Sequence, residues 1–367
     1  MRIESIVEPR KMIALESEWR NLADICPTAT VFQTYEWNVT WWRYFGRSFG
    51  RKLRLLCFRD TQGALVGLAP LMITPFHLVT LRRVAFLGLG TSDYLDLICA
   101  PGHEDAVEQA FHQALSEMSG WDMVDLQQLR QGGLLCSQST GTSLFKSSET
   151  SQEACPYIDL PETWEEYLKS LGKKTRSNIS YYDRGLTKVY DVEFESVSDD
   201  DVLKEEMENL FDLHQRRWNQ RWLPGVFGTK RVQQFHHEVA RMLMHKGWLR
   251  LFVLRLDGLT QAALYCFSFN GRTCYYQGGF EPTLSKLSLG TVLTARAIHT
   301  SIDEGKKVFD FLRGDEPYKA KWTSQSVINV RRVLTRKGAV VDPVVRYTQR
   351  IEENIEHRAK SWIRGLK

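Results

Sequence analysis

Residues 273–322 read TCYYQGGF EPTLSKLSLG TVLTARAIHT SIDEGKKVFD FLRGDEPYKA KW, and this stretch decides the fold. It predicts, in this order, a strand, a polar loop, an apolar helix and a second strand, over residues 273–280, 281–291, 292–304 and 308–312. The helix begins at Gly290-Thr291. A helix start offers free N–H groups and a positive dipole end, and a glycine there lets a pyrophosphate come close to the backbone. The stretch therefore predicts an anion site.

This strand–loop–helix–strand unit resembles the coenzyme A site of GNAT acyltransferases. Residues 311–322 (FLRGDEPYKAKW) resemble the end of the GNAT-like domain in the CelD-type family, which is associated with cellulose and other polysaccharide biosynthesis and is distantly related to the Fem-type peptidoglycan-branching transferases. The resemblance is strongest over residues 159–322 and extends more weakly to 31–37 (VFQTYEW) and 92–97 (SDYLDL). It departs from the usual Arg/Gln-x-x-Gly-x-Gly/Ala phosphate loop, of which residues 286–291 (KLSLGT) keep one glycine and one basic residue.

The resemblance implies an α/β (α+β) fold of two tandem GNAT-like domains, each a mixed, mostly antiparallel sheet flanked by helices. The two halves of the chain repeat the same order of elements, and a length of 367 residues makes two domains the default. We expect a degenerate GNAT-like domain over residues 1–150, a GNAT acyltransferase domain over 151–340 and an amphipathic helix over 341–367. Residues 131–154, rich in Ser, Thr and Gly, are expected to form a linker or an exposed loop.

Alternating apolar residues and turn signals predict the other elements. Strands are expected over residues 52–59, 65–73, 82–89, 94–100, 123–127, 248–256, 261–270 and 327–335, and helices over 12–25, 35–45, 105–118, 161–171, 201–221 and 229–245. The dipeptides Asp257-Gly258 and Asn270-Gly271 are strong hairpin signals, and Asp60-Thr61-Gln62-Gly63 supports a further hairpin.

The composition narrows the class of protein. A hydrophobic content of 43% with 25% charged residues fits an ordinary folded soluble protein. The net charge of +4 is only mildly basic, so it favours an anionic partner weakly and does not indicate binding to DNA. The 7 cysteines form no Cys-x-x-Cys pair, which indicates reduced thiols and a cytoplasmic location. No apolar run is long enough to span a membrane.

GNAT-type catalysis requires few catalytic side chains. An acyl thioester must lie beside a nucleophile, a backbone N–H polarises its carbonyl, and a base or water takes the proton. Asp310 is a candidate base, because its neighbours Phe309 and Phe311 should point to the opposite face of the strand and leave it facing a polar cleft. A salt-bridge partner is the alternative role of Asp310. Tyr275 and Asp93 are the further catalytic candidates.

The donor is expected along the first strand and at the helix start. Paired glycines in Gln277-Gly278-Gly279 are a candidate bulge at which this strand separates from its neighbour, although they can equally end an ordinary hairpin strand. Serine and threonine at the helix start suit both a plain cap and a phosphate site. The resemblance implies acetyl-CoA or another acyl-CoA as co-substrate. The expected donor-binding residues are Gln277, Gly278, Ser288, Gly290 and Thr291.

The acceptor is expected where the second strand ends, since ligands gather at strand ends in open α/β sheets. Arg313 and Lys319 can hold a phosphate or an anionic acceptor, with a solvated charged loop as the alternative. The basic run over 173–178 with Arg184 can touch a phosphate-bearing acceptor or form a solvated helix face. The expected acceptor-binding residues are Tyr94, Arg313, Tyr318, Lys319 and Trp322.

The sequence thus predicts an acyltransferase that moves an acetyl or other acyl group from acyl-CoA to an amine or hydroxyl of a sugar, nucleotide-sugar or glycan precursor. A Fem-like transferase that uses aminoacyl-tRNA and a non-catalytic accessory protein of polysaccharide biosynthesis are the alternatives. Only the Fem-like alternative has tRNA as a partner, and none of the three hypotheses has DNA as a partner. The expected C-terminal amphipathic helix is also compatible with a peripheral contact to a membrane surface. His236, His237 and His245 lack metal-ligand spacing, so no metal is expected.

Overall fold

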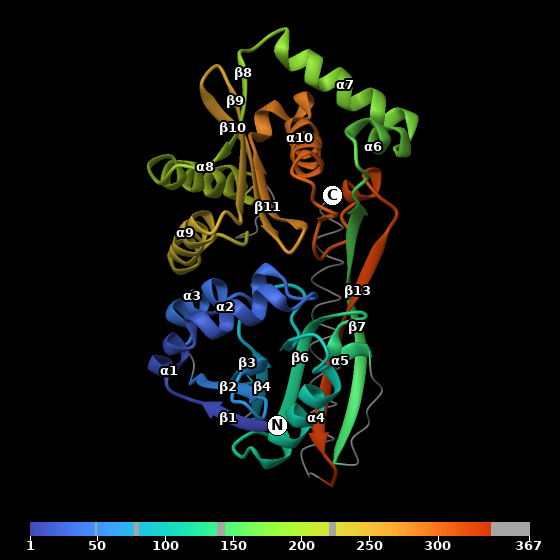
Figure 1. Ribbon diagram of the computed structural model, residues 1–367. Helices are drawn as coiled ribbons and strands as arrows, with labels where there is room; N and C mark the ends of the chain where they lie inside the picture. Colours follow the sequence, from blue (N-terminus) through green and yellow to red (C-terminus); the bar gives the residue numbers. More distant parts are fainter. Residues whose placement is uncertain (48–49, 77–80, 138–143, 220–224, 339–367) are drawn as a thin grey trace. The chain divides into compact units, whose positions relative to one another are not determined.

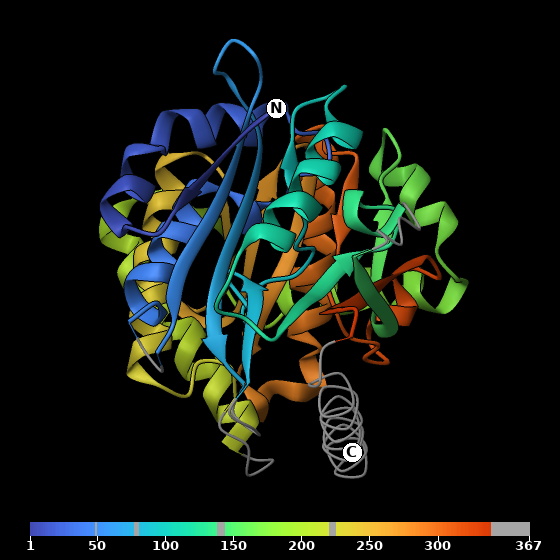
Figure 2. The same cartoon turned by 90° about the horizontal axis from the view of Figure 1, so that it is seen from below.

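The computed structural model describes residues 1–47, 50–76, 81–137, 144–219 and 225–338. Its contacts divide the chain into two compact units, Met1–Gln152 together with the chain from Asn329 onward, and Glu153–Ile328. Each unit is a sheet covered by helices (Figures 1 and 2). The strands β7 (Phe145–Asp159) and β13 (Ser326–Arg336) have residues in both units.

The sheet of the first unit has the strand order β1-β2-β3-β4-β6-β13, with β5 paired to β3. Strands β4 and β6 run parallel, and the other neighbouring pairs are antiparallel. The strands are β1 (Arg2–Ile6), β2 (Lys52–Arg59), β3 (Leu65–Pro75), β4 (Arg82–Phe86), β5 (Ile98–Cys99) and β6 (Met123–Arg130), and the helices are α1 (Pro9–Ala14), α2 (Glu16–Ile25), α3 (Tyr35–Phe45), α4 (Glu104–Glu117) and α5 (Leu134–Ser137), with a 3₁₀ turn at η1 (Val31–Gln33). The hairpin between β2 and β3 turns where the sequence predicts, because Asp60 accepts the N–H groups of Gln62 and Ala64.

The sheet of the second unit has the order β7-β12-β11-β10-β9-β8. Its strands are β8 (Val192–Val197), β9 (Leu249–Leu256), β10 (Leu259–Phe269), β11 (Arg272–Phe280) and β12 (Val308–Asp310), and its helices are α6 (Trp164–Ser170), α7 (Lys173–Thr187), α8 (Asp200–Asn219), α9 (Lys230–His245) and α10 (Leu289–Asp303), with 3₁₀ turns at η2 (Pro282–Leu287) and η3 (Lys319–Lys321). The hairpins β9–β10 and β10–β11 turn at the predicted dipeptides, where Asp257 and Asn270 have positive φ.

Helices cover both faces of this second sheet. On one face α10, α6 and α7 pack on Phe252, Leu254 and Leu264 in a continuous apolar core. On the other face α8 comes so close to β11 that a Cβ added to Gly279 would lie 2.7 Å from the backbone nitrogen of His214. Figure 1 shows α8 and α9 on one side of the sheet and α10 on the other. This layering places the start of α10 beside the end of β11.

The fold class predicted from the sequence is confirmed, since the chain is a mixed α/β protein with mostly antiparallel sheets flanked by helices. Two local predictions were wrong. Only Ile98–Cys99 of the expected strand 94–100 is a strand, because Tyr94 has φ 53 and turns the chain. Residues 145–154 of the expected linker belong to the long strand β7.

The boundaries of the units differ from the expected domain limits. The first unit ends at Gln152, and residues 329–334 of β13 pair with β6 of that unit, whereas the sequence placed this strand in the second domain. That residues 1–150 form a degenerate GNAT-like domain stays a prediction. The expected C-terminal helix over 341–367 lies outside the described residues.

Candidate active site

The pairing of β11 with β12 ends early. These two parallel strands share only the register pairs Arg272 with Val308, Thr273 with Phe309, and Cys274 with Asp310. Strand β12 stops at Asp310, while β11 continues to Phe280 and stays paired with β10 on its other side. Residues 275–280 therefore have a backbone edge with no strand partner in the described part of the chain. Such an edge offers N–H and C=O groups to an extended ligand.

A bulge interrupts β11 where this edge begins. Tyr265 pairs with Gln277 and the next residue, Cys266, pairs with Tyr275, so Tyr276 is the extra residue. The bulge lies one residue before the predicted Gln277-Gly278-Gly279. An extra residue changes the facing of a strand. Tyr275 accordingly packs on the α10 side, with its ring 6.1 Å from that of Phe311.

Tyr276 packs toward α9 on the opposite side of the sheet. Its ring centroid lies 5.4 Å from that of His236 and 5.8 Å from that of Tyr265. His236 is fully buried, and this burial lowers its pKa to about 3, with the neighbouring His237 adding a smaller effect. The buried rings pack against β11 at the bulge and fix the position of the edge that no described strand covers.

The start of α10 has unused donors. Ser288 precedes the helix with φ 53, and its carbonyl accepts the N–H groups of Thr291 and Val292. The N–H groups of Leu289 and Gly290 have no acceptor in the described part of the protein. Together with the positive end of the helix dipole, these donors suit an anion.

A lysine adds a positive charge at the same place. Lys321 donates from Nζ to Oγ1 of Thr291 at 2.7 Å. Burial of the Lys321 side chain lowers its pKa. No carboxylate of a described residue lies within 4.0 Å of this ammonium group. A partly desolvated cation without a counter-ion favours an incoming anion.

The glycines of this region serve different purposes. A Cβ added to Gly278 would lie 2.5 Å from the hydroxyl of Tyr275 and 2.8 Å from Leu264, so the packing of β11 requires this glycine. A Cβ added to Gly290 would meet only the ring of Phe280, at an ordinary 3.4 Å. The fold therefore does not require a glycine at position 290. The donor-binding roles of Gln277, Gly278, Ser288, Gly290 and Thr291 stay predictions, but the structure brings Ser288, Gly290 and Thr291 together at one helix start.

Asp310 forms an ion pair. Its side chain is fully buried, Oδ2 lies 2.6 Å from Nη1 of Arg272, and Oδ1 accepts the N–H of Leu312 at 2.8 Å. Leu312 has φ 54, and the hydrogen bond that its N–H donates to Asp310 holds this strained turn in place. The geometry favours the salt-bridge alternative, and the catalytic role of Asp310 stays a prediction.

Lys319 is engaged within its own loop. Its buried Nζ donates to the carbonyl oxygens of Leu312, Arg313 and Gly314 at 3.3, 3.0 and 3.1 Å, and it pairs with Glu316 at 2.9 Å. This ammonium group organises the segment that follows β12. The acceptor-binding role predicted for Lys319 stays untested.

The remaining predicted residues are divided between the two units. Trp322 is buried and its carbonyl accepts the hydroxyl of Tyr167, while Arg313 and Tyr318 are partly exposed. Asp93 and Tyr94 are buried in the first unit, where the guanidinium of Arg130 lies 5.3 Å from the Tyr94 ring. The structure does not test the roles predicted for these residues.

Lys321 is the residue of this site to which the sequence assigned no role, although it lies in the segment after the second strand that the sequence singled out. It stands two positions after Lys319 in the same basic segment, and no local pattern distinguishes the two. A contact with Thr291, thirty positions earlier, gives Lys321 its place. Only the turn of η3 and the position of α10 reveal that contact.

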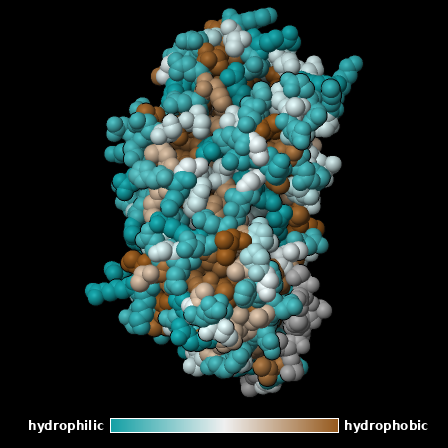
Figure 3. All heavy atoms as spheres, viewed as in Figure 1, coloured by the Kyte–Doolittle hydropathy of each residue, from teal (hydrophilic) through white to brown (hydrophobic). Residues whose placement is uncertain are grey.

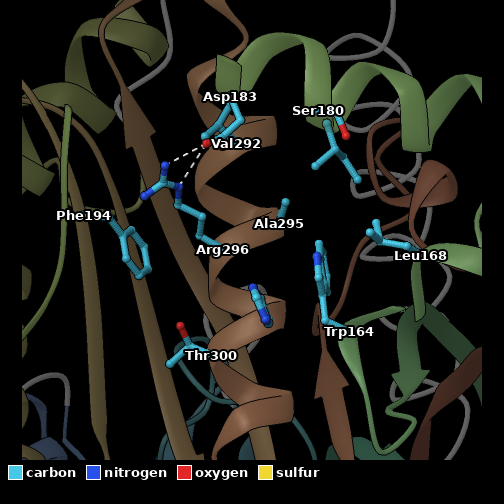
Figure 4. Close-up of a pocket in the computed structure, with 11 residues that line it drawn as sticks. Trp164, Leu168, Ser180, Asp183, Phe194, Val292, Ala295, Arg296 and Thr300 are labelled. Atoms are coloured by element: carbon cyan, nitrogen blue, oxygen red, sulfur yellow. Dashed lines mark hydrogen bonds and ion pairs between the residues drawn. The ribbon is translucent and has the colours of Figure 1, made fainter. Parts of the chain in front are cut away.

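A cavity of about 440 Å³ lies on the outer side of α10, under α7 (Figure 4). Arg296 of α10 donates to Oδ1 of Asp183 of α7 at 2.7 Å and lies 5.5 Å from the ring of Phe194. Trp164 stacks on His299 with centroids 4.8 Å apart. These contacts tie α6, α7 and β8 to α10.

Part of the chain matches a known protein family. Residues 173–320 match the family model described as an acetyltransferase (GNAT) domain. The matched residues lie within the second unit. The splayed strands, the bulge and the helix start described above all lie within the matched residues. No curated protein sequence matches the chain.

Solved structures share the fold at low identity. FemX superposes with a TM-score of 0.61 at 11% identity, over 90% of this chain and 97% of that chain. A conserved protein of unknown function from Bacteroides thetaiotaomicron gives 0.56 at 9% identity, over 91% and 100%. The C-terminal domain of a putative lysylphosphatidylglycerol synthetase from Agrobacterium fabrum gives 0.52 at 12% identity, over 89% and 92%. These likenesses concern the fold alone.

The described residues lack two further features. They include no group of three His, Cys, Asp or Glu side chains arranged to hold a metal ion. No helix among them is both long and apolar enough to cross a membrane.

Proposed function

We propose that the chain is an acyltransferase that takes an acetyl or other acyl group from acyl-CoA and transfers it to an amine or hydroxyl. The observation that carries the proposal is the end of the β11–β12 pairing after Cys274 and Asp310, with the start of α10 beside the open edge. An extended thioester arm fits an open strand edge, and a pyrophosphate fits a helix start with an adjacent cation.

The residues present suit the chemistry. Backbone N–H groups of residues 275–280 supply the donors that polarise a thioester carbonyl. The acceptor nitrogen or oxygen forms the new bond to the acyl carbon, the C–S bond breaks, and the acceptor proton leaves to water or a side-chain base. The departing thiolate takes up a proton, and Tyr275 is our candidate donor because it lies on this strand facing α10. Asp310 is less suited to act as the base, since both of its oxygens are engaged.

The acceptor class rests on the resemblance to the CelD-type family. It suggests a sugar, nucleotide-sugar or glycan precursor as the acceptor and polysaccharide biosynthesis as the context. A Fem-like reaction with aminoacyl-tRNA is the second candidate, and the fold likeness to FemX is what keeps it in view. A non-catalytic accessory role is the third.

Thermal unfolding with separate ligands tests the proposal. A ligand that binds only the folded state raises the unfolding temperature. We expect acetyl-CoA and CoA to raise the unfolding temperature and uncharged nucleosides to leave it unchanged. A rise with aminoacyl-tRNA and none with CoA would transfer the proposal to the Fem-like reaction. CoA binding without acyl transfer to any sugar or nucleotide-sugar would leave the accessory role.

A further inference from the structure

The outward face of α7 is basic. Its exposed cations are Lys173, Lys174 and Arg184, and Lys188 follows directly after the helix. The helical period puts these four positions within one face. Salt bridges within 4.0 Å are absent for all of them among the described residues. This face was the basic run that the sequence singled out and that the proposed acyl transfer does not use.

The inward face of α7 fixes this orientation. Ile179 and Leu186 are buried in the apolar core, and the only carboxylate of the helix, Asp183, binds Arg296 of α10. The cations therefore stay outside without any rearrangement of the helix. A helix of 15 residues presents them along about 22 Å.

Exposed apolar side chains lie among and beside these cations. Tyr181 on α7 is 68% exposed, Val189 just beyond the helix is 71% exposed, and Leu259 is 66% exposed. The antiparallel pairing of Val192 with Leu256 places Val189 and Leu259 at the same end of the β8–β9–β10 sheet. In Figure 3, apolar residues interrupt the hydrophilic surface at the top of the view, where Figure 1 shows this end and α7.

Of the two acidic residues at this end, Asp257 and Asp191, the first has a carboxylate with a structural role. Asp257 accepts the backbone N–H of Asp191 at 2.9 Å, and its own N–H donates to the carbonyl of Asp191 at 2.9 Å. Both carboxylates stand at the strand ends rather than on α7. The α7 face itself thus remains positive.

We propose that this face, defined by Lys173, Lys174, Tyr181, Arg184, Lys188, Val189 and Leu259, docks on the surface of a bilayer containing anionic phospholipids. Lysine and arginine near such a surface are attracted to its phosphates. Transfer of the exposed Val189 and Leu259 side chains into the apolar boundary of the bilayer lowers the free energy, and a tyrosine is suited to the interface. A nucleic-acid backbone would attract the cations equally, but it offers nothing to the two aliphatic side chains, and Tyr181 alone is a poor stacking platform. The inference is independent of acyl transfer.

Co-sedimentation of the full chain with vesicles tests the docking surface. Vesicles of phosphatidylcholine with phosphatidylglycerol should bind the protein, and vesicles of phosphatidylcholine alone should not. The variant Lys174→Gln with Lys188→Gln should weaken partition into anionic vesicles about 25-fold, from about five-fold per charge. The variant Val189→Ser with Leu259→Ser should also weaken partition into anionic vesicles, but the dependence of that partition on salt should stay as in the parent.

The matched control is Lys204→Gln with Lys230→Gln, which removes the same charge from exposed positions on α8 and α9. We expect this control to partition as the parent does. An equal loss in the control, or no binding of the parent to anionic vesicles, would overturn the proposal. So would a loss of single-stranded RNA binding in the α7 variant with vesicle binding unchanged, because the face would then serve nucleic acid. Unchanged unfolding temperatures establish that every variant is folded.

Discussion

Replacing Gly290 with valine separates ligand binding from folding at the start of α10. The Cβ of the new side chain meets only the Phe280 ring at 3.4 Å, and position 290 has no positive φ. Glycine and valine are both weak helix formers. The free energy of unfolding should therefore change by no more than about 0.5 kcal/mol. Any large effect on CoA binding then has to come from the ligand side.

The expected loss of affinity follows from the unused N–H groups of Leu289 and Gly290. A branched side chain at this point keeps a pyrophosphate away from the backbone. A hydrogen bond to a charged group contributes about 1.5–3 kcal/mol. Losing one such contact should weaken CoA binding roughly ten- to a hundred-fold. Calorimetric titration of CoA into the parent and the variant measures this directly.

Gly185→Val is the matched control. Gly185 lies in helix α7, and a Cβ there meets no atom within 4 Å. It repeats the same chemical change in a helix away from the start of α10, so its CoA affinity should equal that of the parent. Equal CoA affinity in Gly290→Val and the parent would refute our assignment of the pyrophosphate to this helix start.

Three further predictions concern buried charge. Lys321→Met should weaken CoA binding about ten-fold. Burial lowers the pKa of Lys321, so as the pH rises the CoA affinity of the parent should begin to fall at a lower pH than an ordinary lysine would give. A pH profile of the variant parallel to that of the parent would contradict this. Asp310→Asn should lower the free energy of unfolding in urea by about 3 kcal/mol, because it removes the buried negative charge that pairs with Arg272. Lost activity with unchanged stability would instead restore Asp310 as the base. His236 has its pKa lowered to about 3, so the unfolded chain takes up a proton below about pH 6.5 that the folded chain refuses, and stability is lost as the pH falls. His236→Leu should remove about 2 kcal/mol of that loss between pH 7 and 5, and a curve still parallel to the parent's would sink the argument.

Local patterns made much of the second unit predictable. The period-two alternation and the dipeptides Asp257-Gly258 and Asn270-Gly271 act over a few residues, so the hairpins β9–β10 and β10–β11 follow from the sequence. The helix after residue 288 follows from its apolar run in the same way. Strand β7 was not predicted from the sequence, because its residues are polar and half-exposed, and long-range pairing rather than propensity makes it a strand.

The candidate site was predictable only in part. A helix start is a local feature, and Ser288, Gly290 and Thr291 were identified from it. The splay depends on where β12 stops, and the bulge at Tyr276 depends on the register with β10. Neither quantity is written in a short stretch of residues, because register is decided by the packing of whole faces. The bulge was therefore expected one residue too late.

The pair Lys319 and Lys321 shows most clearly what tertiary contacts add. The two lysines lie in one 3₁₀ turn, whose residues point in directions about 120° apart, so positions two apart face different surroundings. Lys319 meets three carbonyl oxygens and Glu316, and its charge is satisfied within the protein. Lys321 meets the hydroxyl of Thr291 and the ring of Trp322 but no carboxylate among the described residues, and its charge is left for an anion. An anionic ligand at the start of α10 therefore gains more from Lys321 than from Lys319, although the sequence favoured Lys319.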